Sequence, residues 1–428
     1  MSNPAVSFGS PIPYAEPLWY SRNLTPHYND SHRNLRAVVR KYVDEEILPY
    51  AFEWESAGKA FKRHAELGYL AGVTGLSHVS LPGNILVHEW DSWHTLILTD
   101  EMSRVVRLQW SSMGTWGWKR YRPPIVNFGT QEQKDKFLPG VANGTIRFCL
   151  GITEPDAGSD VANIKTTAVR KGDIYIVNGF KKWITNGIWA DYVTAAVRTG
   201  GKGASGISVL VIPLKVSGVS TRQMHNSGVG ASGSTFITFD DVLVPISNLI
   251  HKENRGFEVI MSNFNAERKS IATQAIRLSR VCVEDAWKHA CTRETFGLKL
   301  IENPIIRTKF VKMGRMIEPA QAFLEQLTWL IELSRKKIGR DVQGVRIGGM
   351  TAMLKVISTR CLEKCAREAQ QVMGGLGYAR GGKGGRIEAI SRDVRVMAVG
   401  GGSEEIMSEL AIREEVKDLT KYAGSSKL

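Results

Sequence analysis

The spacing of apolar residues changes twice along this chain, and these changes constrain the fold more than any other feature. Between Ser31 and Phe52, apolar residues recur at three- and four-residue steps, which is typical of an amphipathic helix. From Phe148 to about Ile250 the spacing falls to two, in short runs separated by glycine. Helical spacing returns at Gly256. The order of helices, strands and helices predicts an α+β fold rather than an α/β fold.

These changes divide the 428 residues into four parts. We expect an N-terminal helical domain with an extended arm (1–147), a middle β domain (148–255), a C-terminal helical bundle (256–419) and a flexible tail (420–428). The bundle rests on long segments with helical spacing, at residues 257–292, 303–337, 344–373 and 403–418. Thr130 and Gln133 match the pattern of a capping box, which predicts that a helix begins there.

The stretch from Phe148 to Gly187 predicts a strand, a polar turn, a second strand, a tight turn and a third strand. The β-branched run Ile174–Val177 is the middle strand, and Asn178-Gly179 is the tight turn after it. Thr153–Asp160 is a loop rich in hydroxyl groups and backbone N–H groups. A loop of this kind can hold a planar, polar heterocycle and its phosphates, although an ordinary β-hairpin would also explain this half alone.

The end of this stretch, Trp183–Gly187, adds an indole and a hydroxyl group. Trp183 and Thr185 are two residues apart, which predicts that both side chains lie on one face of a strand. T-E-P-D-A-G-S-D at residues 153–160 and W-I-T-N-G at residues 183–187 together resemble the flavin-binding segments of the acyl-CoA dehydrogenase family. The resemblance extends over residues 32–418. It implies an N-terminal helical domain, a middle β domain and a C-terminal four-helix bundle.

The same resemblance implies bound FAD. It assigns Ile152, Thr153, Ser159, Trp183 and Thr185 to the flavin, and Ser159 also to the substrate. Because the family completes each flavin site with residues of a second subunit, it implies a homodimer or homotetramer.

Arg293–Gly297 is similar to the family's R-x-x-F-G element, which assigns Arg293 and Phe296 to the flavin of a neighbouring subunit. A guanidinium suits a pyrophosphate because it donates two hydrogen bonds at once. The alternative is a helix C-cap, with Arg293 in the last turn and Gly297 ending the helix. Pro304 stands where many members have a glutamine, so one flavin contact differs here.

Residues 371–378 resemble the family's Q-x-x-G-G-x-G-Y element, which assigns Gln371 and Gly375 to the cofactor of the partner subunit. Residues 377–383 also match G-x-x-x-x-G-K. Gly384 follows where a phosphate-binding loop needs Ser or Thr for Mg²⁺, so a nucleotide triphosphate site is not expected.

Residues 393–406 are similar to the family's loop before the last helix, with one departure. Ser403 and Glu405 match positions that contact the adenosine part of the flavin. Gly401 stands where many members carry the catalytic glutamate.

A base is chemically required, because desaturation of a thioester removes a proton from Cα. A carboxylate held in an apolar pocket gains basicity. Isovaleryl-type and long-chain members carry their glutamate on a bundle helix, directly before an arginine, and Glu267-Arg268 occupies that place. We therefore predict Glu267 as the base and Arg268 as a residue that orients coenzyme A or the helix. A solvated helix-face carboxylate is the alternative for Glu267, and Glu404 and Glu405 are the other candidate bases.

The resemblance implies FAD-dependent α,β-dehydrogenation of an acyl-CoA to the trans-2-enoyl-CoA. The electron acceptor is open, because peroxisomal acyl-CoA oxidases of this fold use O₂. The length of 428 residues is that of a dehydrogenase rather than of those longer oxidases. A nitroalkane oxidase would need an aspartate on the loop where Gly401 stands.

The chain is basic, with a net charge of +14 and a pI of about 9.5. Polyanionic coenzyme A accounts for this charge, and so would DNA, which one bacterial branch of the family binds. Lys and Arg are spread along the chain without a long basic extension, so a nucleic-acid partner is not favoured. The length of the acyl chain stays open, and lipid metabolism and secondary metabolism are the two alternatives for the pathway.

The remaining features concern location. The five cysteines form no CxxC pair, which is typical of reduced core cysteines in an intracellular protein and does not favour a metal site. No membrane-spanning run and no secretory signal are expected. Ser426-Lys427-Leu428 matches the peroxisomal address, which predicts an import receptor as a partner.

Overall fold

The computed structural model describes residues 8–22, 25–50, 60–70, 74, 81–106, 124–338 and 347–422. Its residues divide into two compact units, and each is built from separate stretches of chain. Unit 1 comprises Met1–Val43, Asp91–Val106 and Arg268–Leu428. Unit 2 comprises Asp44–Trp90 and Arg107–Glu267.

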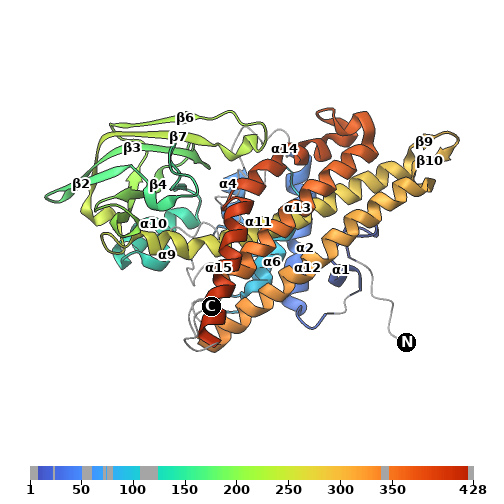
Figure 1. Cartoon of the computed structure of the whole chain (residues 1–428), viewed down its shortest axis with the longest axis horizontal. Coiled ribbons are helices and arrows are strands. Elements are labelled where there is room, and N and C mark those ends of the chain that lie inside the picture. Colours follow the sequence, from blue (N-terminus) through green and yellow to red (C-terminus); the bar gives the residue numbers. More distant parts are fainter. Residues whose placement is uncertain are drawn as a thin grey trace. The chain divides into compact units, whose positions relative to one another are not determined.

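Figure 1 labels the elements in chain order. The α-helices are α1 (Leu18–Arg22), α2 (Asp30–Tyr42), α4 (Ala60–Glu66), α6 (Ser92–Met102), α9 (Pro124–Phe128), α10 (Gln131–Ala142), α11 (Gly256–Thr292), α12 (Pro304–Ile338), α13 (Gly348–Met373), α14 (Gly385–Val399) and α15 (Glu404–Tyr422). The strands are β1 (Phe148–Gly151), β2 (Thr167–Lys171), β3 (Ile174–Ile184), β4 (Tyr192–Arg198), β5 (Ile207–Pro213), β6 (Val219–Gln223), β7 (Thr235–Pro245), β8 (Leu249–Ile250), β9 (Glu294–Thr295) and β10 (Leu298–Lys299). Within the described residues, no helix is long and apolar enough to span a membrane.

Unit 1 is a helical bundle in which α13 packs against α12, α14 and α15, and α6 packs against α2 and α12. These long helices run beside one another in Figure 1. The buried stripe of α13 includes Ala352, Leu362 and Ala369, all with no exposed area. Four of the helices match the expected long segments. A further helix, α14, was not expected, because it follows directly on a run of glycines.

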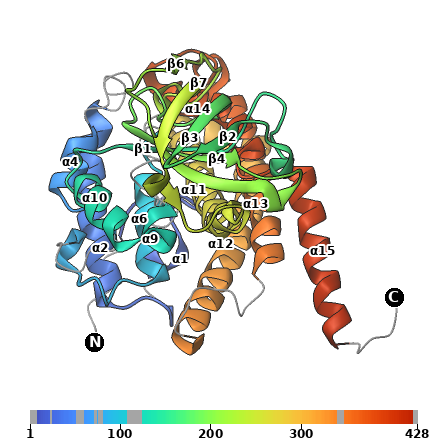
Figure 2. The ribbon, with the colours of Figure 1, turned by 90° about the vertical axis from the view of Figure 1, so that its left-hand side faces the viewer.

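Unit 2 contains one eight-stranded sheet in the order β6-β7-β3-β2-β4-β5-β8, with β1 paired to β4 in parallel. Neighbouring strands are otherwise mostly antiparallel; the contact of β2 with β4 is parallel. One apolar core lies between strands and includes Val177, Val193 and Ile212. The other core joins β5 to α9, α10 and the first turns of α11. Figure 2 shows α9 and α10 next to each other, on the side of the sheet where this second core lies.

The α+β fold class and the helix, sheet, helix order are therefore confirmed. The Thr130 capping box is present: its hydroxyl accepts from the Gln133 N–H (3.2 Å), and the Gln133 side chain accepts from the Thr130 N–H (3.1 Å). The tight turn at Asn178-Gly179 was wrong. β3 continues through these residues with a shift in register to β7, because Gly179 adopts a φ of 139° that allows a bulge.

The segment before α2 is held in unit 1 by buried charges. The expected extended arm is partly helical, since α1 forms one turn. Arg277 of α11 donates to Glu16 (2.6 Å) and to both carboxylate oxygens of Asp100. Arg40 of α2 donates to Glu16 (2.9 Å) and to Glu101 (2.5 Å). Every carboxylate in this network faces a guanidinium, which compensates the cost of burying charge.

Glu16 makes the stability of unit 1 depend on acid. Burial alone would raise its pKa, but Arg277 and Arg40 together lower it to about 2 from 4.5. A carboxylate with a lowered pKa stabilises the fold above pH 4.5, and this contribution is lost as the pH falls toward 2. It amounts to roughly 3 kcal/mol when complete. We expect the difference in unfolding free energy between wild type and Glu16→Gln, from urea titrations, to stay nearly constant down to about pH 5 and to shrink steadily from there to pH 3. A difference that stays constant over this range would contradict the assignment.

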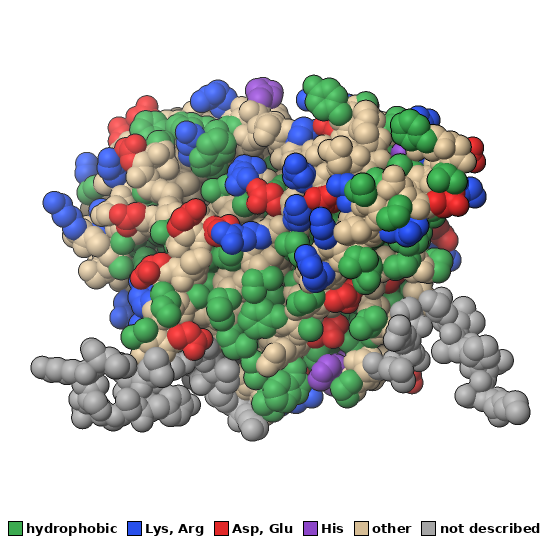
Figure 3. Space-filling view, turned by 45° about the vertical axis from the view of Figure 1, so that its right-hand side comes forward, with side chains coloured by type: hydrophobic (Ala, Val, Ile, Leu, Met, Phe, Trp, Pro, Cys, Tyr) green, Lys and Arg blue, Asp and Glu red, His purple; other side chains and the backbone are tan. Residues whose placement is uncertain are grey.

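The charged side chains on the surface can be compared with the sequence, in which Lys and Arg are spread along the chain. On the face shown in Figure 3, Lys and Arg side chains lie among Asp and Glu side chains rather than in one continuous basic patch. Many are paired, as Arg395 with Glu363 and Lys309 with Glu368 are. On this face the distribution agrees with a diffuse positive field.

Candidate functional site

The end of β3 carries an aromatic side chain in an unusual backbone conformation. Trp183 has a φ of 63° and lies at a shift in register between Lys181 and Ile184. Its side chain is 52% exposed. A non-glycine residue at positive φ costs energy and is most often retained at functional sites. The prediction that Trp183 and Thr185 share a strand face was wrong, because the bulge breaks the alternation and β3 ends at Ile184.

The Thr153–Asp160 loop is fixed to this bulge by a buried ion pair. The Glu154 carboxylate accepts from the N–H groups of Lys165 (2.5 Å) and Thr166 (3.1 Å), and from Lys181 Nζ (2.7 Å). Lys181 Nζ also donates to the Ile152 carbonyl (3.1 Å). The loop backbone is thus held by charge-assisted bonds on both sides.

Electrostatics keep this pair charged near neutral pH. Burial lowers the pKa of Lys181 to about 8, opposed by Glu154. Burial would raise the pKa of Glu154, but Lys181 and the hydrogen bonds to the carboxylate hold it below its usual value. The sequence analysis missed both residues. A lysine in a strand is normally assigned to the solvent face, and no local pattern shows that Lys181 is fully buried.

Five predicted flavin residues lie in unit 2. Thr153 and Trp183 are brought together, because the Thr153 carbonyl accepts from the N–H of Lys182 (2.8 Å). Ile152 is buried, Thr153 and Thr185 are half-buried, and Ser159 is exposed on the loop. A flat exposed indole beside a clamped loop with free hydroxyl groups fits a planar heterocycle that carries phosphates.

Arg293 and Phe296 lie in unit 1, directly after α11. Thr292 is the last residue of the helix, and β9 and β10 form a small hairpin whose two turn residues, Phe296 and Gly297, have φ of 52° and 78°. The alternative of Gly297 as the helix-ending residue is therefore wrong, because Gly297 serves the turn of the hairpin. Arg293 and Phe296 are both exposed, as are Gln371 in the last turn of α13 and Gly375 directly after that helix.

The predicted base and the glycine loop are linked through Arg268. Glu267 and Arg268 are half-buried on α11. Arg268 Nε donates to the Gly401 carbonyl (3.0 Å), so α11 is tied to the loop that contains Gly401. Gly401 and Gly402 have φ of 71° and 108°.

The alternative bases are less suitable. Glu404 is paired with Arg360 of α13. Glu405 is exposed, and its own backbone N–H and the Ser403 hydroxyl lower the pKa of its carboxyl, which makes it a weaker base. Glu267 remains the predicted base.

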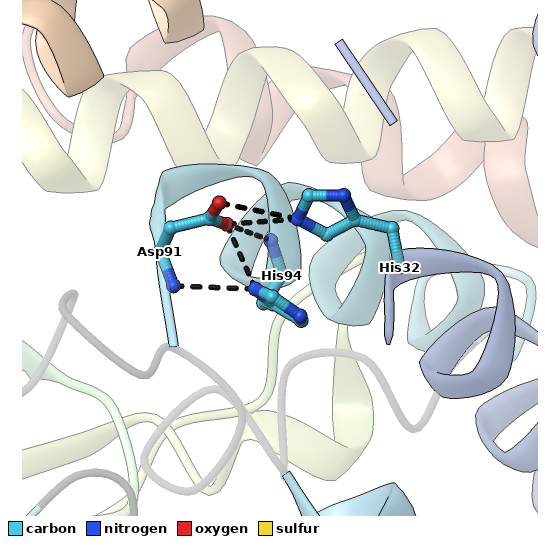
Figure 4. Close-up of side chains that lie close together, drawn as sticks. All are labelled: His32, Asp91 and His94. Carbon is cyan, nitrogen blue, oxygen red and sulfur yellow. Dashed lines mark hydrogen bonds and ion pairs between the residues drawn. The ribbon is translucent and has the colours of Figure 1, made fainter. Parts of the chain in front are cut away.

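His32, Asp91 and His94 form a cluster whose atoms lie close enough to suggest a metal centre (Figure 4). Their hydrogen bonds argue otherwise. The Asn29 N–H donates to His32 Nδ1 (3.0 Å), so Nε2 carries the proton and donates to Asp91 (3.1 Å). His94 Nδ1 lies 3.2 Å from the Asp91 N–H and 2.8 Å from Asp91 Oδ1. The nitrogens that a cation would need are already engaged.

The same bonds explain what the cluster does. Asn29 and Asp91 are the N-caps of α2 and α6, and His32 and His94 are the third residues of two capping boxes. His94 Nε2 lies 3.0 Å from Ser31 Oγ, which donates to Asn29 Oδ1 (2.8 Å). The bonds form a ring that joins the starts of both helices. Burial would raise the pKa of Asp91, but the hydrogen bonds to its carboxylate, first among them the one from His32, hold it far below its usual range. We assign the cluster a structural role.

Comparison with protein families matches three models. They are the acyl-CoA dehydrogenase N-terminal domain at residues 29–145, the middle domain at residues 149–242 and the C-terminal domain at residues 254–415. Together they cover most of the chain.

Curated relatives match over nearly their whole length. Acyl-CoA dehydrogenase AFT10-1 of Alternaria alternata is 48% identical, over 97% of this chain and 98% of the relative. The mitochondrial long-chain specific acyl-CoA dehydrogenase of Mus musculus is 29% identical, over 91% and 88% respectively. Among solved structures, a probable acyl-CoA dehydrogenase from Mycobacterium abscessus is 32% identical, with a TM-score of 0.78 over 90% of this chain and 99% of that one.

Proposed function

The chain belongs to the acyl-CoA dehydrogenase family, whose members are FAD-dependent oxidoreductases acting on CH–CH groups, and from this we propose a specific assignment of its residues. The protein converts an acyl-CoA to the trans-2-enoyl-CoA, with Glu267 as the base. The observation that carries the proposal is the pairing of Trp183, exposed at a bulge, with a loop fixed by Glu154 and Lys181.

The chain's own residues divide the work. FAD, when bound, accepts the hydride that leaves Cβ. Glu267 takes the proton from Cα, so the C–H bond electrons form the double bond. Trp183 offers a flat face to the isoalloxazine, and Thr153, Ser159 and Thr185 offer hydroxyl groups. Arg268 fixes the helix turn next to the base by its bond to the Gly401 carbonyl.

The position of the base has support beyond local geometry. Long-chain members carry a helix glutamate followed by arginine, and the Mus musculus relative belongs to that class by its name. Gly401 has no carboxylate to offer. Purified protein should contain about one FAD per subunit, and a saturated acyl-CoA should bleach it without oxygen. A protein that cannot be loaded with FAD would overturn the proposal.

We further propose that O₂ is a poor electron acceptor for this enzyme. Support comes from the Alternaria alternata relative, a protein named a dehydrogenase that spans the same length. Stopped-flow mixing of the reduced enzyme with oxygen decides the matter. Reoxidation over minutes fits a dehydrogenase, and reoxidation within turnover time identifies an oxidase.

Assembly is a second proposal. Family members are typically homo-oligomers, and we propose a homodimer or homotetramer in which Arg293, Gln371 and Gly375 reach the flavin of a partner subunit. Their exposure in unit 1 supports this. Ser403 and Glu405 at the start of α15 join this set by the same resemblance. Light scattering of the purified protein distinguishes dimer from tetramer.

Trp183→Ala should weaken FAD binding about tenfold, because an aromatic contact of this kind contributes roughly 1 to 1.5 kcal/mol. The dissociation constant can be measured by titrating apo-protein with FAD and following flavin fluorescence. Phe180→Ala is the matched control: Phe180 lies on the same strand and is 49% exposed, but outside the bulge. Equal losses in both variants would show that the indole has no special role.

Location is the last proposal. Ser426-Lys427-Leu428 lies outside the described residues, and we propose that it directs the protein to peroxisomes through an import receptor. Deletion of the three residues should move a fluorescent fusion to the cytosol and leave the activity of purified protein unchanged, since a receptor reads the address. If the truncated protein remains in peroxisomes, another signal or a partner carries it there.

A further inference from the structure

Lys355 is a fully buried lysine in the N-terminal third of α13. Its Nζ donates to the Ala398 carbonyl (2.5 Å) and to the Gly402 carbonyl (2.7 Å). A buried ammonium group is costly unless polar partners surround it. These two carbonyls belong to the last turn of α14 and to the loop that follows, so the ammonium group binds one short stretch of backbone.

That stretch is the glycine loop, residues 400–402, between α14 and α15. Its shape requires glycine: Gly401 and Gly402 have φ of 71° and 108°, which residues with a Cβ adopt only with strain. The C-terminal end of a helix also carries partial negative charge on its unpaired carbonyls. A cation at the end of α14 therefore stabilises both the helix end and the turn.

A second cation completes the arrangement. The Gly401 carbonyl lies in the chain between the two carbonyls that Lys355 binds, and it accepts from Arg268 of α11 (3.0 Å). Arg360 of α13 pairs with Glu404 at the start of α15. Side chains from two helices thus hold successive positions of the loop. Arg268 is also the residue directly after Glu267 in the sequence.

We propose that Lys355 is a positioning residue for the reaction. Lys355 holds the glycine loop in place, and the Gly401 carbonyl of this loop accepts a hydrogen bond from Arg268. Arg268 in turn holds the turn of α11 that carries Glu267. This rests on the proposed function, because it takes Glu267 as the base. Lys355 has no contact role toward substrate or cofactor in this scheme and acts only through the loop.

The test compares Lys355→Met, which keeps most of the side-chain volume and removes the donors, with Lys355→Gln, which keeps an N–H₂ group. Lys309→Met is the matched control, since it removes a lysine of the same unit that pairs with Glu368 (2.6 Å). All three are compared as FAD-loaded protein. The first readout is hydrogen exchange in peptides covering residues 400–403, without substrate.

We expect exchange in the loop to rise at least tenfold in Lys355→Met, less in Lys355→Gln and not at all in Lys309→Met. The second readout is the limiting rate of flavin bleaching at saturating acyl-CoA. It should fall about 10- to 100-fold in Lys355→Met, because small displacements of a reacting group have effects of this size. Half-saturation should change less than twofold, and Lys355→Gln should recover part of the rate.

Two results would overturn the proposal. One is loop exchange in Lys355→Met that equals wild type. The other is a loss of rate in Lys355→Met that Lys309→Met reproduces, since this would report general destabilisation. Failure of the base assignment gives a different result, because Glu267→Gln would then bleach at the wild-type rate. The hydrogen exchange of the loop in Lys355→Met does not depend on which residue is the base.

Discussion

Glu267→Gln should lower the rate of flavin bleaching by a saturated acyl-CoA by about 10² to 10⁴, the usual cost of losing a general base. Glutamine keeps the shape of the side chain but cannot accept the Cα proton. FAD content and acyl-CoA binding should survive, because neither needs the carboxylate. The measurement is anaerobic stopped-flow absorbance of the flavin at saturating substrate.

Glu258→Gln is the control for this experiment. Glu258 lies on the same helix and pairs with His251 and Arg255 at the surface, so its loss should leave bleaching unchanged. If Glu267→Gln bleaches at the wild-type rate while Glu404→Gln or Glu405→Gln does not, the base lies on the loop after all.

A glutamate introduced at position 401 tests the same assignment in reverse. Gly401→Glu in a Glu267→Gly background would place a carboxylate where relatives carry theirs. At a φ of 71°, the new side chain is strained, and the bond from Arg268 to the Gly401 carbonyl must survive. We therefore expect only partial recovery of the rate.

Arg277→Met should lower the free energy of unfolding by about 3 to 5 kcal/mol, because it leaves buried carboxylates without their cation. Glu16 and Asp100 both face this guanidinium. Burial already raises the pKa of Asp100 against the pull of Arg277, so removing the cation would raise it further. Urea unfolding at pH 7 measures the loss.

Two further variants separate charge from packing at this site. Arg335→Met, which removes a more exposed arginine paired with Glu332, should cost less than about 1 kcal/mol. Adding Glu16→Gln and Asp100→Asn to Arg277→Met removes the uncompensated charges and should restore part of the stability. A triple variant less stable than Arg277→Met alone would show that packing, and not charge, sets the cost.

Much of the fold could be predicted because local signals agree with the global arrangement. The Thr130 capping box depends on residues three apart, and the change of apolar spacing at Phe148 depends on the pleat of a strand. Each of these patterns involves only a few neighbouring residues, so it can be recognised without knowing which distant segments pack against it.

The rest depends on contacts between distant segments. Asn178-Gly179 has the composition of a turn, but pairing with β7 draws it into a bulge. Lys181 is buried because Glu154 lies 27 positions earlier in the chain, across the loop. Gly297 lies in the turn of a hairpin and does not end a helix, although Arg-x-x-Phe-Gly fits both. No pattern in the sequence around Lys355 indicates that this residue binds a loop 47 positions later.

The division of unit 1 into separate stretches has a consequence for synthesis. A ribosome delivers Met1–Val43 and Asp91–Val106 long before Arg268–Leu428. Arg277 is synthesised 177 positions after Asp100 and 261 positions after Glu16, so both acids lack their cation during that time. Unit 2 is complete at Glu267 and can form its sheet while the bundle is still unfinished. During that interval the nascent chain exposes apolar helix faces and unpaired acids, so we expect it to depend on chaperones that bind during translation.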